Sequence, residues 1–240
     1  EISKNIIDWR RHIHAYPELG MELPMTADFV SEKLESWGMD VHTKIGKSGV
    51  VGIVRGYESG PTIALRADMD ALPIQETGSV SYKSKHDGIM HACGHDGHTA
   101  MLLGAAKILS KKKSMLKGTL KFIFQPGEEG YFGAKHMIED GCLKGVDEIY
   151  GIHLWNYQPY GEVGVKPGPI LAAADKFFIN IRGIGGHGAA PQGTVDAVVV
   201  GSYLVNLFQT IVSRNTNPID SAVVTVGKFK SGNNFNIIAD

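Results

Sequence analysis

One short segment of the chain concentrates side chains that bind transition metals. Residues 91–98 read His-Ala-Cys-Gly-His-Asp-Gly-His and place one thiol, three imidazoles and one carboxylate within eight residues. Thiolate and imidazole are preferred ligands of zinc and of neighbouring first-row metals. We expect Cys93 and His95 to lie on an extended, glycine-flanked loop, where alternate residues point to the same side. A bare Cys-x-His pair more often combines a buried cysteine with a helix-capping histidine, so this interpretation depends on further ligands.

Two later segments offer such ligands, each at the end of a predicted strand. Glu128 and Glu129 follow the apolar run 122–124, which makes a solvated acidic turn a less natural setting for them. Because neighbouring side chains do not easily face one metal, we expect one to be a ligand and the other a general base. His153 ends the next strand and could complete the site or be an ordinary core histidine. A metal cluster with a spare carboxylate is the minimum for metal-assisted hydrolysis.

Three other side chains are candidates for supporting roles. Asp68 and Asp70 end an earlier strand and could orient a ligand histidine from behind, although Asp68 could equally form an ion pair with Arg66. His187 lies in a glycine-rich turn and could donate a hydrogen bond to a developing oxyanion. On its own it would be read as a turn histidine.

The elements that must position these residues alternate between helix and strand. This alternation predicts an α/β domain with a mostly parallel sheet, and open α/β sheets bind ligands at the carboxyl ends of their strands. A second β-α-β pattern follows the Pro-Gly-Pro at 167–169, so we predict domains at 1–168 and 169–240. The expected helices are 2–15, 26–37, 98–110, 133–140 and 195–214, and the expected strands are 40–45, 50–55, 62–67, 118–125, 148–153, 175–182 and 222–229.

The composition argues against several other classes of protein. Lys and Arg total 24 against 25 Asp and Glu, so no basic patch points to nucleic acid or to a membrane surface. No apolar stretch is expected to span a bilayer. Two cysteines do not make a disulfide framework, and we expect a reduced, cytoplasmic protein in which Cys142 is structural. The chain begins without methionine and ends without a closing element, so we expect a fragment of a longer protein.

Taken in order, these segments resemble the M20 family of metallopeptidases and amidohydrolases. Within it they are most similar to the N-acyl-amino-acid amidohydrolases, which include hippurate hydrolases, indole-3-acetyl-amino-acid hydrolases and N-acetyl-diaminopimelate deacetylases. The resemblance rests on the segments Trp9–His14, Pro17–Gly20, Arg66–Ile74, Met90–His98, Phe124–Gly130, Gly151–Trp155 and Gly185–Pro191. It implies a catalytic α/β domain with an inserted ferredoxin-like lid that also forms a homodimer, and it implies that this chain ends inside the lid.

The resemblance also implies a role for individual residues. Its metal ligands correspond to Cys93, His95, Glu129 and His153, and its general base corresponds to Glu128. It further implies that His187 reaches the active site of the partner subunit and that Asn236 contacts the substrate. One more histidine ligand, near the C-terminus of family members, has no counterpart here. Gln192 and Ala197 stand where the family often has His and Pro, which leaves position 192 without an assigned role.

The implied activity is hydrolysis of an N-acyl amino acid to a carboxylic acid and an amino acid. One or two divalent ions would assist, with zinc or manganese first and cobalt or nickel next. Two alternatives stay open: a carboxypeptidase or dipeptidase of the same fold, and a non-catalytic metal-binding dimeric protein whose lid only joins subunits. A substrate panel separates the first alternative, and the effect of Glu128→Gln on turnover separates the second.

Overall fold

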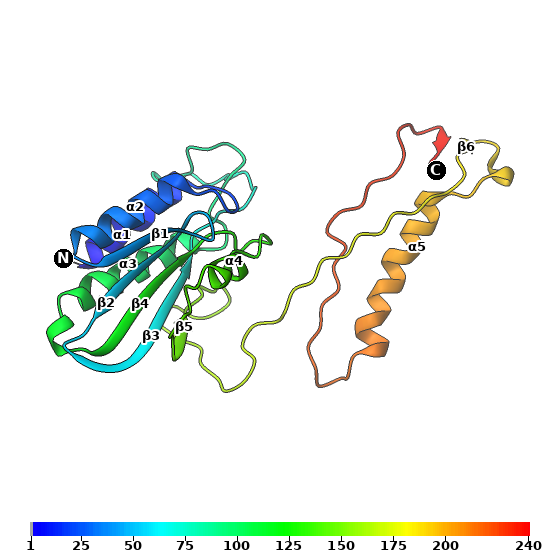
Figure 1. Ribbon diagram of the computed structural model, residues 1–240. Helices are drawn as coiled ribbons and strands as arrows, with labels where there is room; N and C mark the ends of the chain where they lie inside the picture. The colour runs from blue at the N-terminus through cyan, green and yellow to red at the C-terminus, as the bar shows by residue number, and fades with distance from the viewer. Residues whose placement is uncertain (1) are drawn as a thin grey trace. The chain divides into compact units, whose positions relative to one another are not determined.

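The computed structural model describes residues 2–240, which fold as two units (Figure 1). The first unit ends at Glu162 and the second spans Val163–Asp240. The boundary predicted at 168 lies six residues beyond Glu162.

The first unit has the expected alternation of helices and strands. Its elements are α1 Ile2–Ala15, α2 Pro24–Ser36, β1 Asp40–Ile45, β2 Gly49–Arg55, β3 Glu58–Asp68, α3 His95–Ser110, the 3-10 helix η1 Lys113–Met115, β4 Lys117–Gln125, α4 Gly133–Glu139 and β5 Glu148–Gly151. Two predicted bounds are wrong in ways that concern the site. The helix expected from residue 98 already begins at His95, and the strand expected to end at His153 ends at Gly151.

A single sheet in the order β1-β2-β4-β3-β5 forms the centre of this unit. β3 pairs in parallel with both β4 and β5, whereas the β1–β2 and β2–β4 pairings are antiparallel. The register sets Asp68 opposite Gln125, and Arg66 opposite Gly151. The carboxyl ends of the three parallel strands therefore meet at one edge, and the predicted α/β class is confirmed.

Apolar cores lie on both faces of the sheet, because successive strand residues point to opposite faces. On one face Phe122 and Phe124 of β4 pack against Leu34 of α2 and Leu103 of α3, all fully buried. Ile123 points to the other face, into a smaller cluster with Met137 of α4 and Cys142. Figure 1 shows the corresponding layers, with α1, α2 and α3 together on one side of the sheet. Burial raises the pKa of the Cys142 thiol, which keeps it protonated.

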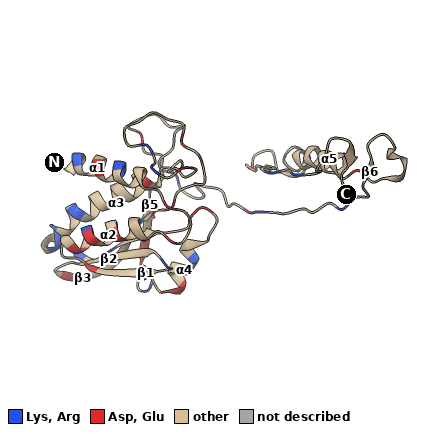
Figure 2. Ribbon diagram, turned by 90° about the horizontal axis from the view of Figure 1, so that it is seen from above, with Lys and Arg blue, Asp and Glu red and all other residues tan. Residues whose placement is uncertain are grey.

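Charged residues of both signs are spread over the first unit. Figure 2 shows Lys and Arg interspersed with Asp and Glu along its helices and strands, in line with the near balance of 24 and 25 in the sequence. Neither sign forms a continuous stripe in this view.

The second unit is organised around one helix. Its elements are β6 Gly186–His187, the 3-10 helix η2 Pro191–Gly193, α5 Ala197–Thr210, the π-helix η3 Ile211–Asn215 and β7 Ile237–Ile238. Asp196 caps α5, because its carboxylate accepts hydrogen bonds from the Val198 and Val199 amides at 2.9 and 3.2 Å. β6 and β7 pair antiparallel.

Two strands predicted in the second unit are wrong. Residues 175–182 and 222–229 carry no strand assignment, although Ile181 and Phe229 both lie against Gly201 of α5. A strand requires a hydrogen-bonded neighbour, and neither segment finds a ladder partner within residues 2–240. Alternating apolar residues were therefore insufficient to predict a sheet here.

The helical segment Ala197–Asn215 departs from the expectation that no stretch of the chain could span a bilayer. It is 19 residues long with a mean hydropathy of 1.2, so by length and composition alone it could cross a membrane. The same length and composition suit the core helix of a globular domain.

Candidate metal centre

The edge where the parallel strands end gathers five of the predicted site residues. Donor atoms of Cys93, His95 and His153 lie within 4.8 Å of one another, and so do those of His95, Glu128 and Glu129. His95 belongs to both groups and thus joins them into one cluster. The residues come from the loop before α3, from the first residue of α3 and from the segments after β4 and β5. The sequence segments that suggested separate ligands therefore converge in space.

The imidazole of His95 is the most informative group of this cluster. Its side chain is 1% exposed, and its Nδ1 lies 2.8 Å from the backbone oxygen of Asp70, to which only a protonated nitrogen can donate. Nε2 has no hydrogen-bond partner within the described residues. It faces Glu129 Oε1 at 3.9 Å and Glu128 Oε2 at 4.0 Å. Because buried polar atoms are nearly always partnered, this nitrogen fits a metal ligand.

Cys93 and His153 face each other beside His95. His153 Nδ1 donates to the backbone oxygen of Leu154 at 2.6 Å, and its Nε2 lies 3.5 Å from the sulfur of Cys93. Both groups can therefore offer a lone pair to one ion. The loop expected for both residues is found for Cys93 but is wrong for His95. His95 is the first residue of α3, and Gly94 between them has φ 86°, a left-handed conformation that favours glycine.

The paired glutamates are held through their backbone. The Asp70 carboxylate, 1% exposed, accepts hydrogen bonds from the Glu128 and Glu129 amides at 3.0 and 2.9 Å. We had expected that adjacent side chains would not face one metal, yet both carboxylates lie within 4.0 Å of His95 Nε2. The Glu128 side chain is 44% exposed and that of Glu129 is 24% exposed. Glu128 thus presents its carboxylate more openly to an incoming molecule.

Asp68 is buried behind this cluster, where it forms the ion pair considered with Arg66 and holds a histidine that is not one of the predicted ligands. Its Oδ2 accepts from Arg66 at 2.8 Å, and its Oδ1 accepts from His98 Nδ1 at 2.6 Å. Its distance to His95 Nε2 is longer, 3.6 Å. Burial opposes ionisation of Asp68, but the His98 hydrogen bond and the Arg66 charge outweigh it and hold the pKa far below its usual value. The sequence pattern gave no signal that the histidine held by Asp68 would be His98.

The electrostatics of the cluster favour a cation. Burial lowers the pKa of His95, but the polar groups of Asp70 and Cys93 beside the ring and the negative charges of Asp68 and Asp70 outweigh it and raise the pKa to about 11. Burial raises the pKa of Glu129, and the charge of Glu128 adds to this effect against the opposing charge of His95. A field that holds a proton on a buried imidazole also favours a divalent ion there. The donor set, one thiolate with imidazoles and carboxylates, suits such an ion.

A buried charge network ties α1 to the start of α3. Asp96 follows His95 directly, and its Oδ2 accepts from Arg10 Nε and from His14 Nδ1, both at 2.8 Å. His14 Nε2 lies 3.4 Å from Glu76 Oε1, so each ring nitrogen faces a carboxylate. The hydrogen bond to Asp96 raises the pKa of His14 despite its burial. The network anchors the helix terminus that carries His95.

The remaining predicted residues belong to the second unit. His187 is in β6, opposite Ile237 of β7, and its Nδ1 accepts from the Ala189 amide at 3.1 Å. Asn236 lies nearby, since its backbone oxygen accepts from the Gly188 amide at 2.9 Å. His187 and Asn236 are therefore neighbours of each other, and their roles toward the first unit stay predictions.

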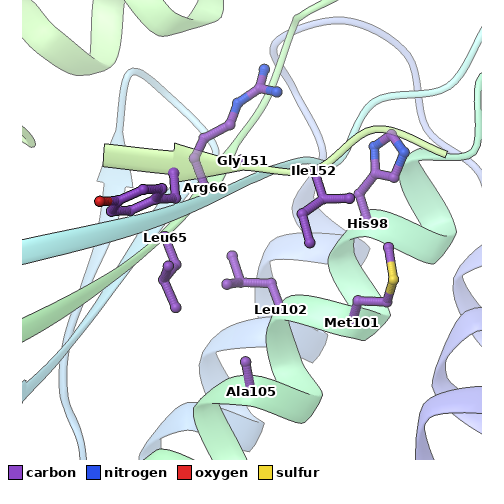
Figure 3. A pocket seen from close by; sticks show the side chains of 9 residues that line it. Leu65, Arg66, His98, Met101, Leu102, Ala105, Gly151 and Ile152 are labelled. Atoms are coloured by element: carbon purple, nitrogen blue, oxygen red, sulfur yellow. The ribbon is translucent and has the colours of Figure 1, made fainter. Parts of the chain in front are cut away.

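An apolar cavity of about 160 Å³ lies beside the cluster (Figure 3). Its walls come from α3, β3 and the end of β5, and they include Leu65, Met101, Leu102, Ala105 and Ile152. None of the five clustered donor residues lines it, although His98 does. The cavity is therefore separate from the clustered donor atoms, although it shares His98 with their surroundings.

Comparison with known proteins agrees with this geometry. The chain matches Peptidase family M20/M25/M40 over residues 64–237. The N-acyl-L-amino acid amidohydrolase of Geobacillus stearothermophilus is 45% identical over 239 residues, which cover 99% of this chain and 65% of that protein. The hippurate hydrolase of Campylobacter jejuni is 47% identical over 234 residues, 96% of this chain and 60% of that protein.

The chain is also similar to a solved structure of an M20-family protein. The YXEP protein of Bacillus subtilis, described as a dinuclear metal-binding peptidase from the M20 family, has a TM-score of 0.76 at 37% identity, covering 100% of this chain and 62% of that one. The chain spans about three fifths of the length of the curated relatives it matches. The resemblance seen in the sequence is confirmed: the chain belongs to the peptidase family M20/M25/M40.

Proposed function

We propose that the protein hydrolyses the amide bond of N-acyl amino acids with the help of divalent ions held by Cys93, His95, Glu129 and His153. The observation that carries the proposal is the buried Nε2 of His95, which has no hydrogen-bond partner among residues 2–240 and is enclosed by thiol, imidazole and carboxylate donors. Support also comes from relatives named N-acyl-L-amino acid amidohydrolase and hippurate hydrolase, and from a solved relative described as dinuclear.

Glu128 is the general base in this proposal. When bound, the ions polarise the acyl carbonyl and lower the pKa of the attacking water. Glu128 is the more exposed of the two glutamates, and its backbone is fixed by Asp70, so its carboxylate is free to take a proton. It accepts the proton of the attacking water and passes it to the leaving amine. Glu129, more buried beside His95, remains a ligand.

The finer parts of the proposal rest on the family resemblance. His187 donates to the oxyanion from the partner subunit of a homodimer, and Asn236 contacts the substrate. Zinc or manganese is the expected ion, and the cytoplasm is the expected compartment. Each of these remains a prediction for the full-length protein.

The test compares two neighbouring substitutions in the full-length protein. Amine release is measured from N-acetyl-, N-benzoyl- and indole-acetyl-amino acids and from dipeptides, with Mn²⁺ or Zn²⁺ added. Glu128→Gln should keep its metal and lose roughly 10²–10⁴-fold in kcat. Glu129→Gln should lose metal content as well. Glu35→Gln, at an exposed position of α2, is the matched control and should behave like the parent.

The possible results separate the alternatives. Preference for acyl-amino acids over dipeptides supports an amidohydrolase, and the opposite preference supports a carboxypeptidase or dipeptidase. A folded, metal-loaded parent without turnover on any of these substrates contradicts the proposal. That result would favour the non-catalytic metal-binding protein instead.

A further inference from the structure

His98 is buried next to the metal cluster, and both of its ring nitrogens are engaged. It lies one turn after His95 on α3 and is 3% exposed. Its Nε2 is 2.8 Å from the backbone nitrogen of Leu154, and its Nδ1 is 2.6 Å from Asp68 Oδ1. A backbone N–H can only donate, so Nε2 must accept and Nδ1 must carry the proton. The two bonds therefore fix one tautomer of His98.

The bonds of His98 extend into a chain across three elements. Arg66 of β3 donates to Asp68 at 2.8 Å, Asp68 accepts from His98 of α3, and His98 accepts from the amide of Leu154, beyond β5. Figure 3 shows the side chain of His98 extending from α3 and lying beside Ile152, which directly follows Gly151. The chain thus connects the rigid core of the sheet to the segment after β5.

Leu154 is the residue through which this chain reaches the cluster. Its backbone N–H is held by His98, while its backbone oxygen accepts from His153 Nδ1 at 2.6 Å. This second bond turns His153 Nε2 toward the Cys93 sulfur, 3.5 Å away. The rings of His98 and His153 also contact edge-on, with centroids 4.6 Å apart.

The segment that His98 holds has few other restraints. β5 ends at Gly151, and the flanking Ile152 and Trp155 are 65% and 52% exposed. Among residues 2–240, β5 pairs only with β3. A ligand on such a segment needs a fixed point behind it, and outer hydrogen bonds commonly set the orientation of metal-binding imidazoles.

A different reading makes His98 itself a ligand. Asp68, His95 and His98 place donor atoms within 4.8 Å of one another, a spacing that could hold an ion. However, the only lone pair of His98 is used by the Leu154 amide, and Asp68 already accepts from His98 and from the Arg66 guanidinium. An ion there would have to displace these buried bonds, so this group is better explained as a hydrogen-bonded clamp.

We propose that His98 is a positioning residue: it clamps the Leu154 amide and thereby orients His153 in the metal cluster, without binding metal itself. The consequence for catalysis rests on the function proposed above. The clamp itself is a property of the protein before any metal binds.

Two substitutions separate the accepting role of His98 from its donating role. In His98→Gln the longer side chain can place an amide oxygen near the former Nε2 and accept from Leu154. In His98→Asn the shorter side chain can still donate to Asp68 but cannot reach Leu154. His136→Asn, on an exposed position of α4, is the control for a histidine-to-asparagine change.

The first readout uses the metal-free, full-length protein. Hydrogen exchange of the Leu154 amide, measured by NMR, should be slow in the parent, in His98→Gln and in His136→Asn, and at least about tenfold faster in His98→Asn. In the parent, the Leu154 amide should also exchange more slowly than that of neighbouring Trp155. This comparison holds even if His98→Asn fails to fold.

The second readout is binding of Co²⁺, whose visible spectrum reports both thiolate and imidazole ligands. His98→Asn should weaken binding by about 10–100-fold, as for other outer-sphere partners, while the thiolate absorption from Cys93 persists. His98→Gln should recover most of the affinity. Loss of a bound ion in both variants with an unchanged Leu154 exchange rate would overturn the proposal and make His98 a ligand.

Fast exchange of Leu154 in the parent would also overturn it. A parent without hydrolytic activity would refute the proposed function but would leave the exchange and cobalt results interpretable. The two failures are therefore distinguishable.

Discussion

Replacing Asp70 by asparagine tests how the paired glutamates are held. The substitution nearly preserves the size of a side chain that is 1% exposed, but it removes the negative charge and replaces one acceptor oxygen by an NH₂ donor. In the parent, both carboxylate oxygens accept backbone amides, those of Glu128 and Glu129, at 3.0 and 2.9 Å. Asparagine keeps one acceptor and turns an NH₂ donor toward the other amide, so two donors face each other.

The expected loss of stability follows from these two bonds. A hydrogen bond to a charged group contributes about 1.5–3 kcal/mol, and a buried donor left unpaired costs about 1–3 kcal/mol. Partial relaxation of the turn offsets some of this sum, so we expect a loss of about 2–4 kcal/mol in the free energy of unfolding. For a domain of this size, the corresponding fall in Tm is roughly 5–15 °C.

The assay is thermal and urea unfolding of the metal-free protein, followed by metal titration. Asp70→Asn should also weaken metal binding, because the displaced amides carry the Glu129 ligand and the Glu128 base with them. Asp87→Asn, the same change at an exposed position, should leave both measurements at the parent values. A parent-like Tm together with parent-like metal affinity in Asp70→Asn would refute the view that this carboxylate organises the glutamate turn.

Two further predictions concern α3 and the network that anchors it. Gly94→Ala places a side chain at φ 86°, where space is available but the backbone is strained. We expect a loss of about 1–2 kcal/mol in the free energy of unfolding and a weaker Cys93 thiolate absorption with Co²⁺. Parent-like cobalt spectra would contradict this. The hydrogen bond to Asp96 raises the pKa of His14 in the folded state above its unfolded value of about 6.5. His14 therefore adds to the free energy of unfolding, fully so below about pH 6.5, and this contribution is lost as the pH rises through the folded pKa. In urea titrations between pH 5 and 9, the free energy of unfolding of His14→Gln should therefore fall less with rising pH than that of the parent. An unchanged pH profile would argue against this role of His14.

The local pattern of the sequence was enough to predict most of the first unit. Apolar periodicity located α1 and α2 to within two residues, because each turns part of one face toward a core. The metal-type residues were found in the same way, since thiol, imidazole and carboxylate groups at the ends of predicted strands are unusual outside a site. Strand ends in a parallel arrangement meet at one edge, so their convergence could be expected before any coordinates.

The same local pattern failed where long-range partners decide the outcome. The expected strands at 175–182 and 222–229 find no ladder partner among the described residues, and strand formation depends on such a partner rather than on alternation alone. The expected loop ends at Gly94, whose left-handed conformation leads into a helix that begins at His95.

Only the tertiary structure determined which hydrogen-bond partners the buried acids and histidines have. Residue types identified Asp68, Asp70 and His98 as polar groups near a cluster of ligands, without saying which group each would contact. Only the fold determines that Asp70 accepts hydrogen bonds from the backbone amides of two glutamates and that His98 Nε2 accepts one from the amide of Leu154. A hydrogen bond depends on distances of a few tenths of an ångström between groups remote in sequence. Those distances are set by the parallel pairing of β3 with β4 and by the position of α3 beside the sheet, and the local sequence does not determine them.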